Sequence, residues 1–388
     1  MEDAKIFMVA NTEFYLWTGA SMYKPVILIG NGMRNDREFL EQLSNPKMVV
    51  PLLTTWMGCD LVAEDNPAFC GRPGILGQRA ANIIQQKATH LYCLGARLDG
   101  EQVFYNYDKF APKAKIFIYD IDDAEFRKFP SRFKRVEDAS YSIRSPEINW
   151  LSWCRNLYDR FRPELDGVDG GKFIDPFYFM DLLGKHTRHD DVFAIGSSGN
   201  APTTFFQTFK VKHGQRIHNC STIGAMGADI PMALGSALAS RKRTICVTGD
   251  GGFQLNAQEL ETVRRTHMPI TFFVFNNNGY ASIRNNQKIR FDGRVTGADP
   301  HSGLTLPALE DLALGYRIPY MKLTVKDLPN FGKCFDYSPM IVEVMVDPDW
   351  AQYPRAMSNL VDGKYVNDDM SDMTPKIPDL QELMAWDG

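Results

Sequence analysis

The sequence lacks the features of a nucleic-acid binder, a membrane protein or a secreted protein. Its 43 Lys and Arg against 47 Asp and Glu give a net charge of −4, so no basic excess is available to bind phosphate backbones. No apolar run reaches the roughly 18 residues that a membrane helix needs. The N-terminal segment MEDAKIF is acidic and has no apolar core followed by a cleavage site, unlike a secretory signal. We therefore expect no nucleic-acid partner and no membrane insertion.

Cysteine is sparse and shows no pairing pattern. The seven cysteines include no CxxC pair, and their number is odd in a long chain. Disulfide frameworks and zinc sites need closely and regularly spaced cysteines. We therefore expect a reduced, cytoplasmic protein without a disulfide framework or a zinc site. The cysteines are Cys59, Cys70, Cys93, Cys154, Cys220, Cys246 and Cys334.

Short apolar runs that alternate with amphipathic stretches fill most of the sequence. Hydrophobic residues make up 44% of its 388 residues, enough for a large core. The apolar runs are rich in β-branched and aromatic residues, which is typical of buried parallel strands. They are Val26–Ile29, Met48–Leu53, His90–Leu94, Ile116–Tyr119, Val192–Ile195, Thr244–Thr248, Ile270–Phe275 and Met340–Val346. Helical periodicity lies between them, as in Arg79–Gln86, Ile230–Ala239 and Asn256–Arg265, and predicts α/β domains with doubly wound parallel sheets.

One segment divides the chain. Residues 163–172, PELDGVDGGK, are rich in Gly and Asp, have no apolar period and are interpreted as a linker. The linker separates a domain at 25–162 from a second domain at 173–347. Residues 1–24 form an N-terminal linker in this interpretation. The polar, proline-broken tail at 348–388 is either disordered or a lid over a site.

The strongest chemical signal follows two of the predicted strands. One strand ends in GDGG at Gly249–Gly252, and the next ends in NNNG at Asn276–Gly279. Parallel strands deliver their C-terminal ends to the same edge of a sheet, and glycines let backbone N–H groups approach an anion. Asp250 and Asn277 bring the oxygen ligands that Mg²⁺ prefers, and Mg²⁺ usually keeps phosphate oxygens in its shell. Either motif alone would be explained by a tight turn, but the pair predicts a diphosphate held through a metal.

These motifs resemble those of the thiamine-diphosphate (ThDP) enzymes of the acetolactate synthase type, which have GDG followed by NN. The resemblance implies that Asp250, Asn277 and the carbonyl of Gly279 bind Mg²⁺, and that Gly251 and Gly252 donate N–H groups to the diphosphate. It also implies a Rossmann-like middle domain before a diphosphate-binding domain. The implied cofactor-binding residues are Gly199, Asn200, Ala201, Gly224, Met226, Gly249, Asp250, Gly251, Gly252, Asn277, Gly279 and Tyr280.

The resemblance extends upstream of the metal motif. The segment IGSSGNA at Ile195–Ala201 resembles the first diphosphate loop of the family, and STIGAMGADIPMALGSALA at Ser221–Ala239 resembles the loop and helix beneath the cofactor. By position, the Gly224 carbonyl would accept from the pyrimidine amino group, and Met226 would wedge under the thiazolium ring. These two residues are the implied catalytic residues of this chain. Taken without its neighbours, Met226 would be ordinary core packing.

Other segments carry further parts of the resemblance. GYASIRNNQ resembles the helix beyond the NN turn, where Arg284 and Gln287 face substrate or form a solvated helix face. The N-terminal domain, with PVILIGNGM and LYCLGARLD, resembles the family's middle domain. Its GxG is weak evidence for a dinucleotide site, so FAD remains a minor possibility and an oxidoreductase a third interpretation. The histidines follow no catalytic spacing.

A pyrimidine-binding domain is missing from the resemblance. That domain supplies the glutamate that activates the cofactor, and no Glu here takes its position; Glu259 and Glu261 lie on the helix after GDGG. We therefore expect a split enzyme whose partner subunit carries the glutamate, in a heterotetramer or larger assembly, although a shortened chain would give the same picture. The implied reaction decarboxylates a 2-oxo acid such as pyruvate and transfers the acyl unit to a carbonyl acceptor. Alternatives are simple decarboxylation, C–C hydrolysis and a non-catalytic ThDP-binding subunit.

Overall fold

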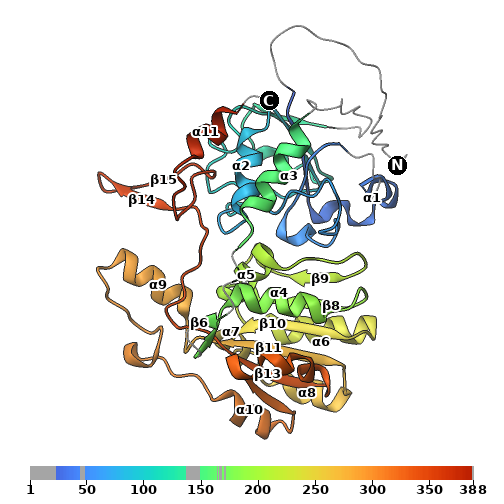
Figure 1. Cartoon of the computed structure of the whole chain (residues 1–388), viewed down its shortest axis with the longest axis vertical. Coiled ribbons are helices and arrows are strands. Elements are labelled where there is room, and N and C mark those ends of the chain that lie inside the picture. Colours follow the sequence, from blue (N-terminus) through green and yellow to red (C-terminus); the bar gives the residue numbers. More distant parts are fainter. Residues whose placement is uncertain are drawn as a thin grey trace. The chain divides into compact units, whose positions relative to one another are not determined.

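A computed structural model describes residues 23–43, 49–136, 149–163, 165, 168–169 and 172–386. The chain forms two compact units (Figure 1). The first contains residues 1–162 and 353–388, and the second contains residues 163–352. Each has a parallel sheet with helices, which confirms the predicted α/β class. Of the predicted linker at 1–24 only the last two residues are described, whereas half of the predicted linker at 163–172 is described and includes a short strand at Val168–Asp169.

The first unit is built on a five-stranded parallel sheet in the order β2-β1-β3-β4-β5. Its strands are β1 (Pro25–Ile29), β2 (Leu52–Thr54), β3 (His90–Leu94), β4 (Lys115–Tyr119) and β5 (Phe133–Arg135). Its helices are α1 (Arg37–Leu43), α2 (Arg79–Lys87) and α3 (Trp150–Arg160), with short 3-10 helices at Asn31–Asn35, Trp56–Gly58 and Glu125–Lys128. The apolar strand β1 is fully buried, as its unbroken hydrophobic run predicts.

The GxG of the first unit brings two loops of its own backbone together. Its sheet changes direction between β1 and β3, the usual place for a ligand crevice in such folds. There a Cβ at Gly30 would lie 2.2 Å from the Gly95 carbonyl oxygen, and one at Gly32 would lie 2.8 Å from the Gly95 Cα. The N–H groups of Gly30 and Gly32 donate to the carbonyls of Leu94 and Gly95, each at 2.9 Å. Close loop packing therefore explains why glycine stands at both positions.

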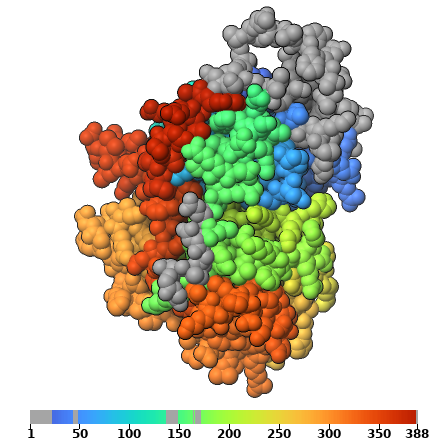
Figure 2. Space-filling view, viewed as in Figure 1, coloured from blue at the N-terminus to red at the C-terminus, as the bar shows by residue number. Residues whose placement is uncertain are grey.

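The C-terminal tail belongs to the first unit from Tyr353 onward. It forms the hairpin β14 (Ser358–Val361) and β15 (Lys364–Asn367) and the helix α11 (Leu380–Ala385). The Trp386 ring stacks on Trp153 of α3 with centroids 4.8 Å apart, and Figure 2 shows the end of the chain (red) against this helix (green). Arg79 of α2 donates to the carbonyls of Met373 and Pro375. Residues predicted as one tail from 348 are thus divided, since 348–352 stay with the second unit.

The second unit has a six-stranded parallel sheet in the order β12-β13-β11-β10-β8-β9. The strands are β8 (Val192–Ile195), β9 (Arg216–Asn219), β10 (Thr244–Gly249), β11 (Ile270–Asn276), β12 (Tyr320–Leu323) and β13 (Met340–Met345). The helices are α4 (Pro176–His186), α5 (Asn200–Thr208), α6 (Asp229–Ser240), α7 (Asp250–Gln254), α8 (Glu259–Thr266), α9 (Ala281–Arg290) and α10 (Leu309–Gly315). Smaller elements are the pair β6 (Val168–Asp169) and β7 (Phe173–Ile174) and 3-10 helices at Pro300–Ser302 and Val325–Phe335.

The strand order of the second unit fixes where a ligand would bind. From β8 the chain passes to β9 on one side and then returns to β10 on the other, so the sheet changes direction between β8 and β10. Loops that leave these two strands diverge and open a crevice at the carboxyl ends. The segments with the predicted diphosphate loops, IGSSGNA and GDGG, follow these strands.

Candidate functional site

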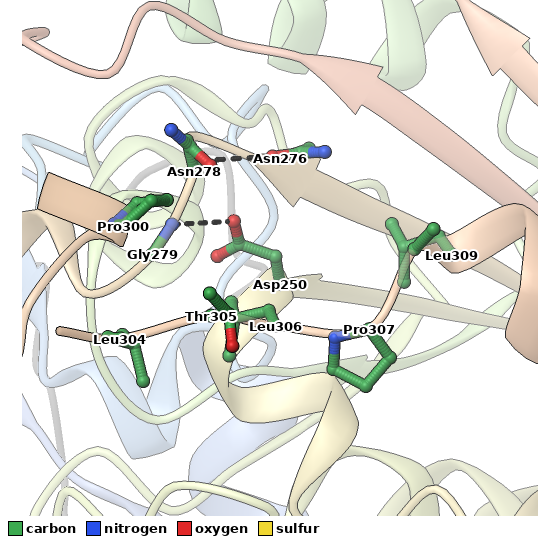
Figure 3. Close-up of a pocket in the computed structure, with 11 residues that line it drawn as sticks. Asp250, Asn276, Asn278, Gly279, Pro300, Leu304, Thr305, Leu306, Pro307 and Leu309 are labelled. Atoms are coloured by element: carbon green, nitrogen blue, oxygen red, sulfur yellow. Dashed lines mark hydrogen bonds between the residues drawn. The ribbon is translucent and has the colours of Figure 1, made fainter.

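The two strand ends with the acidic and amide motifs lie side by side. β10 and β11 are parallel neighbours, with Gly249 opposite Phe275. The Asp250 carboxylate accepts the N–H of Gly251 at 2.8 Å and the N–H of Gly279, beyond β11, at 3.0 Å (Figure 3). Only 6% of Asp250 is exposed. The geometric expectation that both tips meet at one edge is therefore confirmed.

Burial and the nearby hydrogen-bond donors shift the pKa of Asp250 in opposite directions. Burial raises the pKa of this carboxyl group to about 6, while backbone N–H groups and the Arg284 guanidinium act to lower its pKa. A divalent cation at the carboxylate would favour the ionised form further. The carboxylate therefore lies in a place where a metal relieves the cost of its burial.

Asn277 has the unsatisfied oxygen that such a metal needs. Its side chain is 5% exposed, and its Oδ1 is buried without a hydrogen-bond partner among the described residues. An unpaired buried amide oxygen costs free energy, so a ligand here is physically favoured. Asn278 at φ +60° and Gly279 at φ +125° carry the chain around the turn. A Cβ at Gly279 would lie 2.4 Å from the Ala298 carbonyl oxygen, so only glycine fits there.

The loop after β8 leaves the other strand at which the sheet changes direction. Gly199 adopts φ +86° and directly precedes α5, and a Cβ at this position would meet open space. Asn200 begins the helix, is 3% exposed and has neither its Oδ1 nor its Nδ2 paired among the described residues. Ala201 follows, fully buried in the first turn. Exposed backbone at a helix start together with an unsatisfied amide fits an anionic ligand.

The Met226 loop, between β9 and α6, is tied to both neighbouring loops. The Ser197 hydroxyl donates to the Ala225 carbonyl, and Asn256 Nδ2 donates to the Gly227 carbonyl at 2.7 Å. Gly224 adopts φ +67° with open space beside it, and the Met226 side chain is 37% exposed. The loop thus exposes the apolar side chain of Met226 and has open space beside Gly224.

Two glycines of GDGG have packing roles that the sequence did not reveal. The Gly251 N–H, expected to face a diphosphate, donates to the Asp250 carboxylate in this structure. A Cβ at Gly251 would lie 2.5 Å from the Tyr280 ring, and one at Gly252 would lie 2.6 Å from an Asp229 oxygen. These positions require glycine because neighbouring side chains cover them, whereas Gly249 has open space beside it.

Comparison with known protein families identifies the fold. Residues 20–144 match "Thiamine pyrophosphate enzyme, central domain", and residues 197–337 match "Thiamine pyrophosphate enzyme, C-terminal TPP binding domain". The chain belongs to the thiamine pyrophosphate enzymes. The two units of the structure thus correspond to the central and the cofactor-binding domains of this family, and thiamine pyrophosphate is another name for ThDP.

Several similar curated proteins are named acetolactate synthase. The large subunit from Corynebacterium glutamicum is 26% identical over 85% of this chain and 56% of its own length. The large subunit from Cyanidium caldarium is 28% identical, over 79% and 54%. The isozyme 2 large subunit from Escherichia coli K12 is 27% identical, over 71% and 51%. The chain thus spans about half the length of the curated relatives it matches.

Two predicted substrate residues of this thiamine pyrophosphate enzyme contact its own backbone. Arg284 is 3% exposed, donates to the carbonyls of Asn277 and Pro348, and lies 3.7 Å from an Asp299 oxygen. Gln287 exchanges hydrogen bonds with the backbone of Thr296. Arg284 therefore holds the turn beyond β11, and Gln287 holds the loop after α9.

Asp229 is a buried acid at the site that sequence analysis missed. It is 2% exposed, and one of its oxygens accepts the Thr248 hydroxyl at 2.5 Å while the other lacks a partner among the described residues. Burial raises its pKa to about 6, against the hydrogen bonds from Thr248 and the Ser197 backbone. The carboxylate joins the ends of β8 and β10 at the start of α6. A charged residue inside the apolar stretch GADIPMALG was the available signal.

A cavity of about 210 Å³ adjoins the turn beyond β11 (Figure 3). It is lined on one side by Asp250, Asn276, Asn278 and Gly279, and on the other by the segment from Pro300 to Leu309. Within the described parts of the chain, no three His, Cys, Asp or Glu side chains cluster to form a metal cage. A metal held mainly by a bound phosphate would need no such cage.

Among the helices that the structure describes, none is long and apolar enough to cross a membrane.

Proposed function

We propose that this chain is the diphosphate-binding part of a ThDP- and Mg²⁺-dependent enzyme that decarboxylates a 2-oxo acid, such as pyruvate, and transfers the acyl unit to a carbonyl acceptor. The acetolactate synthase relatives support this reaction class. The observation that carries the proposal is the meeting of the β10 and β11 ends, where buried Asp250 lies beside an unsatisfied Asn277 oxygen. Simple decarboxylation is the alternative outcome of the same site.

The residues around the crevice fit the cofactor's polar end. Asp250, Asn277 and the Gly279 carbonyl would hold Mg²⁺, and the unsatisfied amide of Asn200 lies on the other side of the crevice for the diphosphate. The two unsatisfied side chains would then gain partners, which offsets the cost of their burial. Bound ThDP supplies a carbon nucleophile and an electron sink for 2-oxo acids.

The Met226 loop fits the cofactor's ring end. The exposed Met226 side chain is adaptable and apolar, so that it would support the thiazolium ring without competing for hydrogen bonds. The Gly224 carbonyl would accept from the pyrimidine amino group and orient it. Both residues would thereby hold the ring end of the cofactor in place.

The activating glutamate is expected from a pyrimidine-binding domain outside this sequence. The described part of the second unit has glutamates at Glu259 and Glu261 on α8, Glu310 on α10 and Glu343 on β13, all outside the loops of the crevice. Ile223, in the Met226 loop, is 82% exposed, an apolar surface suited to contact with another domain. We therefore propose that either a partner subunit or a further segment carries the glutamate. A partner subunit would form a heteromer with this chain.

Calorimetric titration of ThDP in the presence of Mg²⁺ tests the cofactor assignment. The unaltered chain should bind, and Asp250→Ala should weaken binding at least tenfold because a charged metal ligand is lost. The matched control is Asp311→Ala, an exposed acid on α10, which should bind like the unaltered chain. Equal affinity of Asp250→Ala and the unaltered chain would refute the assignment.

Turnover of pyruvate tests the division of the enzyme. The chain alone should release little CO₂, and a separately produced pyrimidine-binding domain should restore release. Analysis of the products then separates carboligation from simple decarboxylation, and ThDP binding without any turnover in the reconstituted mixture would favour the non-catalytic alternative. Full turnover by the chain alone would refute the partner requirement.

A further inference from the structure

The three consecutive asparagines of the turn beyond β11 have different surroundings. Asn277 has the unsatisfied oxygen of the candidate metal site. The side chain of Asn276 instead contacts the neighbouring strand, where its Nδ2 donates to Glu343 Oε1 at 2.5 Å. Val274 is paired with Glu343 in the parallel ladder of β11 and β13, so Asn276, two residues further on, lies on the same face of the sheet as Glu343.

Glu343 is a buried carboxylate with several partners. It is 5% exposed, its Oε2 accepts the Tyr320 hydroxyl from β12, and Lys322 Nζ lies 3.7 Å from the same oxygen. Burial and the charge of Glu343 raise the pKa of Tyr320, so Tyr320 remains a hydrogen-bond donor at neutral pH. The carboxylate is therefore held in place from the edge strand while it accepts from Asn276.

The other end of the Asn276 amide reaches the metal-binding turn. Asn276 Oδ1 accepts the backbone N–H of Asn278 at 3.0 Å (Figure 3). Asn278 is in the left-handed region, and the next N–H, from Gly279, reaches the Asp250 carboxylate at 3.0 Å. Hydrogen bonds, together with the backbone from Asn278 to Gly279, thus connect β13 to Gly279 and Asp250, two of the three residues proposed to bind the metal.

A carboxylate at position 343 determines which way the Asn276 amide points. An ionised carboxylate only accepts hydrogen bonds, so the amide must present its NH₂ to Glu343 and its oxygen to the Asn278 N–H. A flipped amide would place two oxygens against each other at Glu343 and two donors against each other at Asn278. The cost of such a mismatch falls mainly on the partly buried contact with Glu343, because the Asn278 N–H lies on the exposed side of the turn.

We propose that Glu343 is a positioning residue that fixes the metal-binding turn through Asn276. The inference rests on the proposed function, since the metal at this turn belongs to it. Glu343 touches neither metal nor substrate in this role. Its effect is to keep the Asn278 and Gly279 N–H groups and the Asn277 side chain in one arrangement before the cofactor binds, which lowers the ordering cost of binding.

Glu343→Gln is the test variant, because glutamine has the same shape but no longer dictates the amide orientation. It should weaken Mg²⁺-dependent ThDP binding by up to about tenfold, the lower end of the range for loss of a direct partner of a metal ligand, because Glu343 acts through Asn276. In the protein without metal and cofactor, the amide hydrogens of Asn278 and Gly279 should exchange faster. Glu310→Gln, which changes an exposed acid on α10, is the control and should leave both measurements nearly unchanged.

A second variant shows whether the effect passes through Asn276. Asn276→Ala should reproduce both changes, and adding Glu343→Gln to it should cause no further loss of affinity. Additive losses, or unchanged exchange at Asn278 and Gly279 in Glu343→Gln, would overturn the inference. Failure of the unaltered chain to bind Mg²⁺ and ThDP would refute the proposed function, while the exchange measurement still decides the role of Glu343.

Discussion

Single residues in this site are understood through the partners that burial forces on them. Four polar side chains near the site are less than a tenth exposed: Asp229, Asp250, Asn277 and Glu343. Each lies near an end of β8, β10 or β11, or is hydrogen-bonded to a residue at one of these ends. Glu343 has a hydrogen-bond partner at each oxygen and Asp229 has one at only one of its oxygens, whereas Asn277 Oδ1 has none among the described residues. Buried polar atoms without partners are candidates for ligand contact, and fully paired groups such as Glu343 support their neighbours.

The raised pKa of Asp229 gives a testable pH dependence. Its pKa in the folded protein is about 6, above the ordinary value of 3.8. The protonated form is therefore favoured by folding, and this contribution to stability is full below about pH 4 and is lost as the pH rises through 6. At pH 8 the loss is at most about 3 kcal/mol, because one pKa unit corresponds to about 1.4 kcal/mol.

Asp229→Asn removes this titration and keeps the shape of the side chain. Relative to the unaltered chain, the variant should gain stability toward denaturant between pH 4 and pH 8. Urea unfolding at several pH values measures the difference, and Asp311→Asn on the surface of α10 serves as control. A stability difference that does not change with pH would contradict the proposed burial cost of Asp229.

At the scale of elements, apolar runs predicted the central strands and the edge strand β2, and missed the edge strands β5, β9 and β12. β3, β8, β10 and β11 coincide with runs of β-branched and aromatic residues. The strand β9, with the sequence RIHN, lies at the edge of its sheet and has two partly exposed residues, so that it lacks the hydrophobic signal. The same reasoning explains β5, FKR, at the edge of the first sheet.

The parts of the candidate site that consist of short motifs directly after strands could be predicted from the sequence. GDGG and NNNG each follow a strand, so the meeting of Asp250 and the Asn277 turn could be derived from parallel-strand geometry. The contact of Glu343 with Asn276 depends on the register of β13 against β11, which no local pattern reveals. The role of Arg284 likewise depends on where the chain passes at Pro348.

The turn beyond β11 gives a prediction at this scale. Gly279→Ala would place a Cβ 2.4 Å from the Ala298 carbonyl oxygen at φ +125°, so the turn must shift. The variant should lose about 1–3 kcal/mol of unfolding free energy, and it should bind Mg²⁺ and ThDP at least tenfold more weakly because the carbonyl proposed to bind the metal moves. Gly293→Ala is the matched control, since Gly293 also has a positive φ of +81° but open space beside it. Equal behaviour of the two variants would show that the close contact at Ala298 does not matter.

At the scale of the whole molecule, the chain leaves its first unit and returns to it. The first unit holds residues 353–388 as well as 1–162, and the tail packs on α2 and α3 through Arg79 and the stacked rings of Trp153 and Trp386. The tail therefore supports the central-domain part of this thiamine pyrophosphate enzyme by the contacts that it makes there.

Trp386→Ala tests this division into two units. It should lower the stability of the first unit by about 1–2 kcal/mol, because a stacked aromatic pair is lost. The affinity of the second unit for Mg²⁺ and ThDP should not change. Leu360→Ala, in the exposed part of the same tail, is the control and should alter neither quantity. Calorimetric melting and ThDP titration measure the two effects, and a loss of ThDP affinity in Trp386→Ala would contradict the assignment of the tail.

The central claim is that the ends of β10 and β11 jointly hold a metal and a diphosphate. Crystals of the chain grown with ThDP and Mn²⁺ in place of Mg²⁺ test it directly, because anomalous scattering locates the manganese. The account predicts one peak at bonding distance, about 2.0–2.3 Å, from both an Asp250 oxygen and Asn277 Oδ1, with diphosphate oxygens completing the shell. A bound ThDP whose metal lies away from either side chain would contradict it.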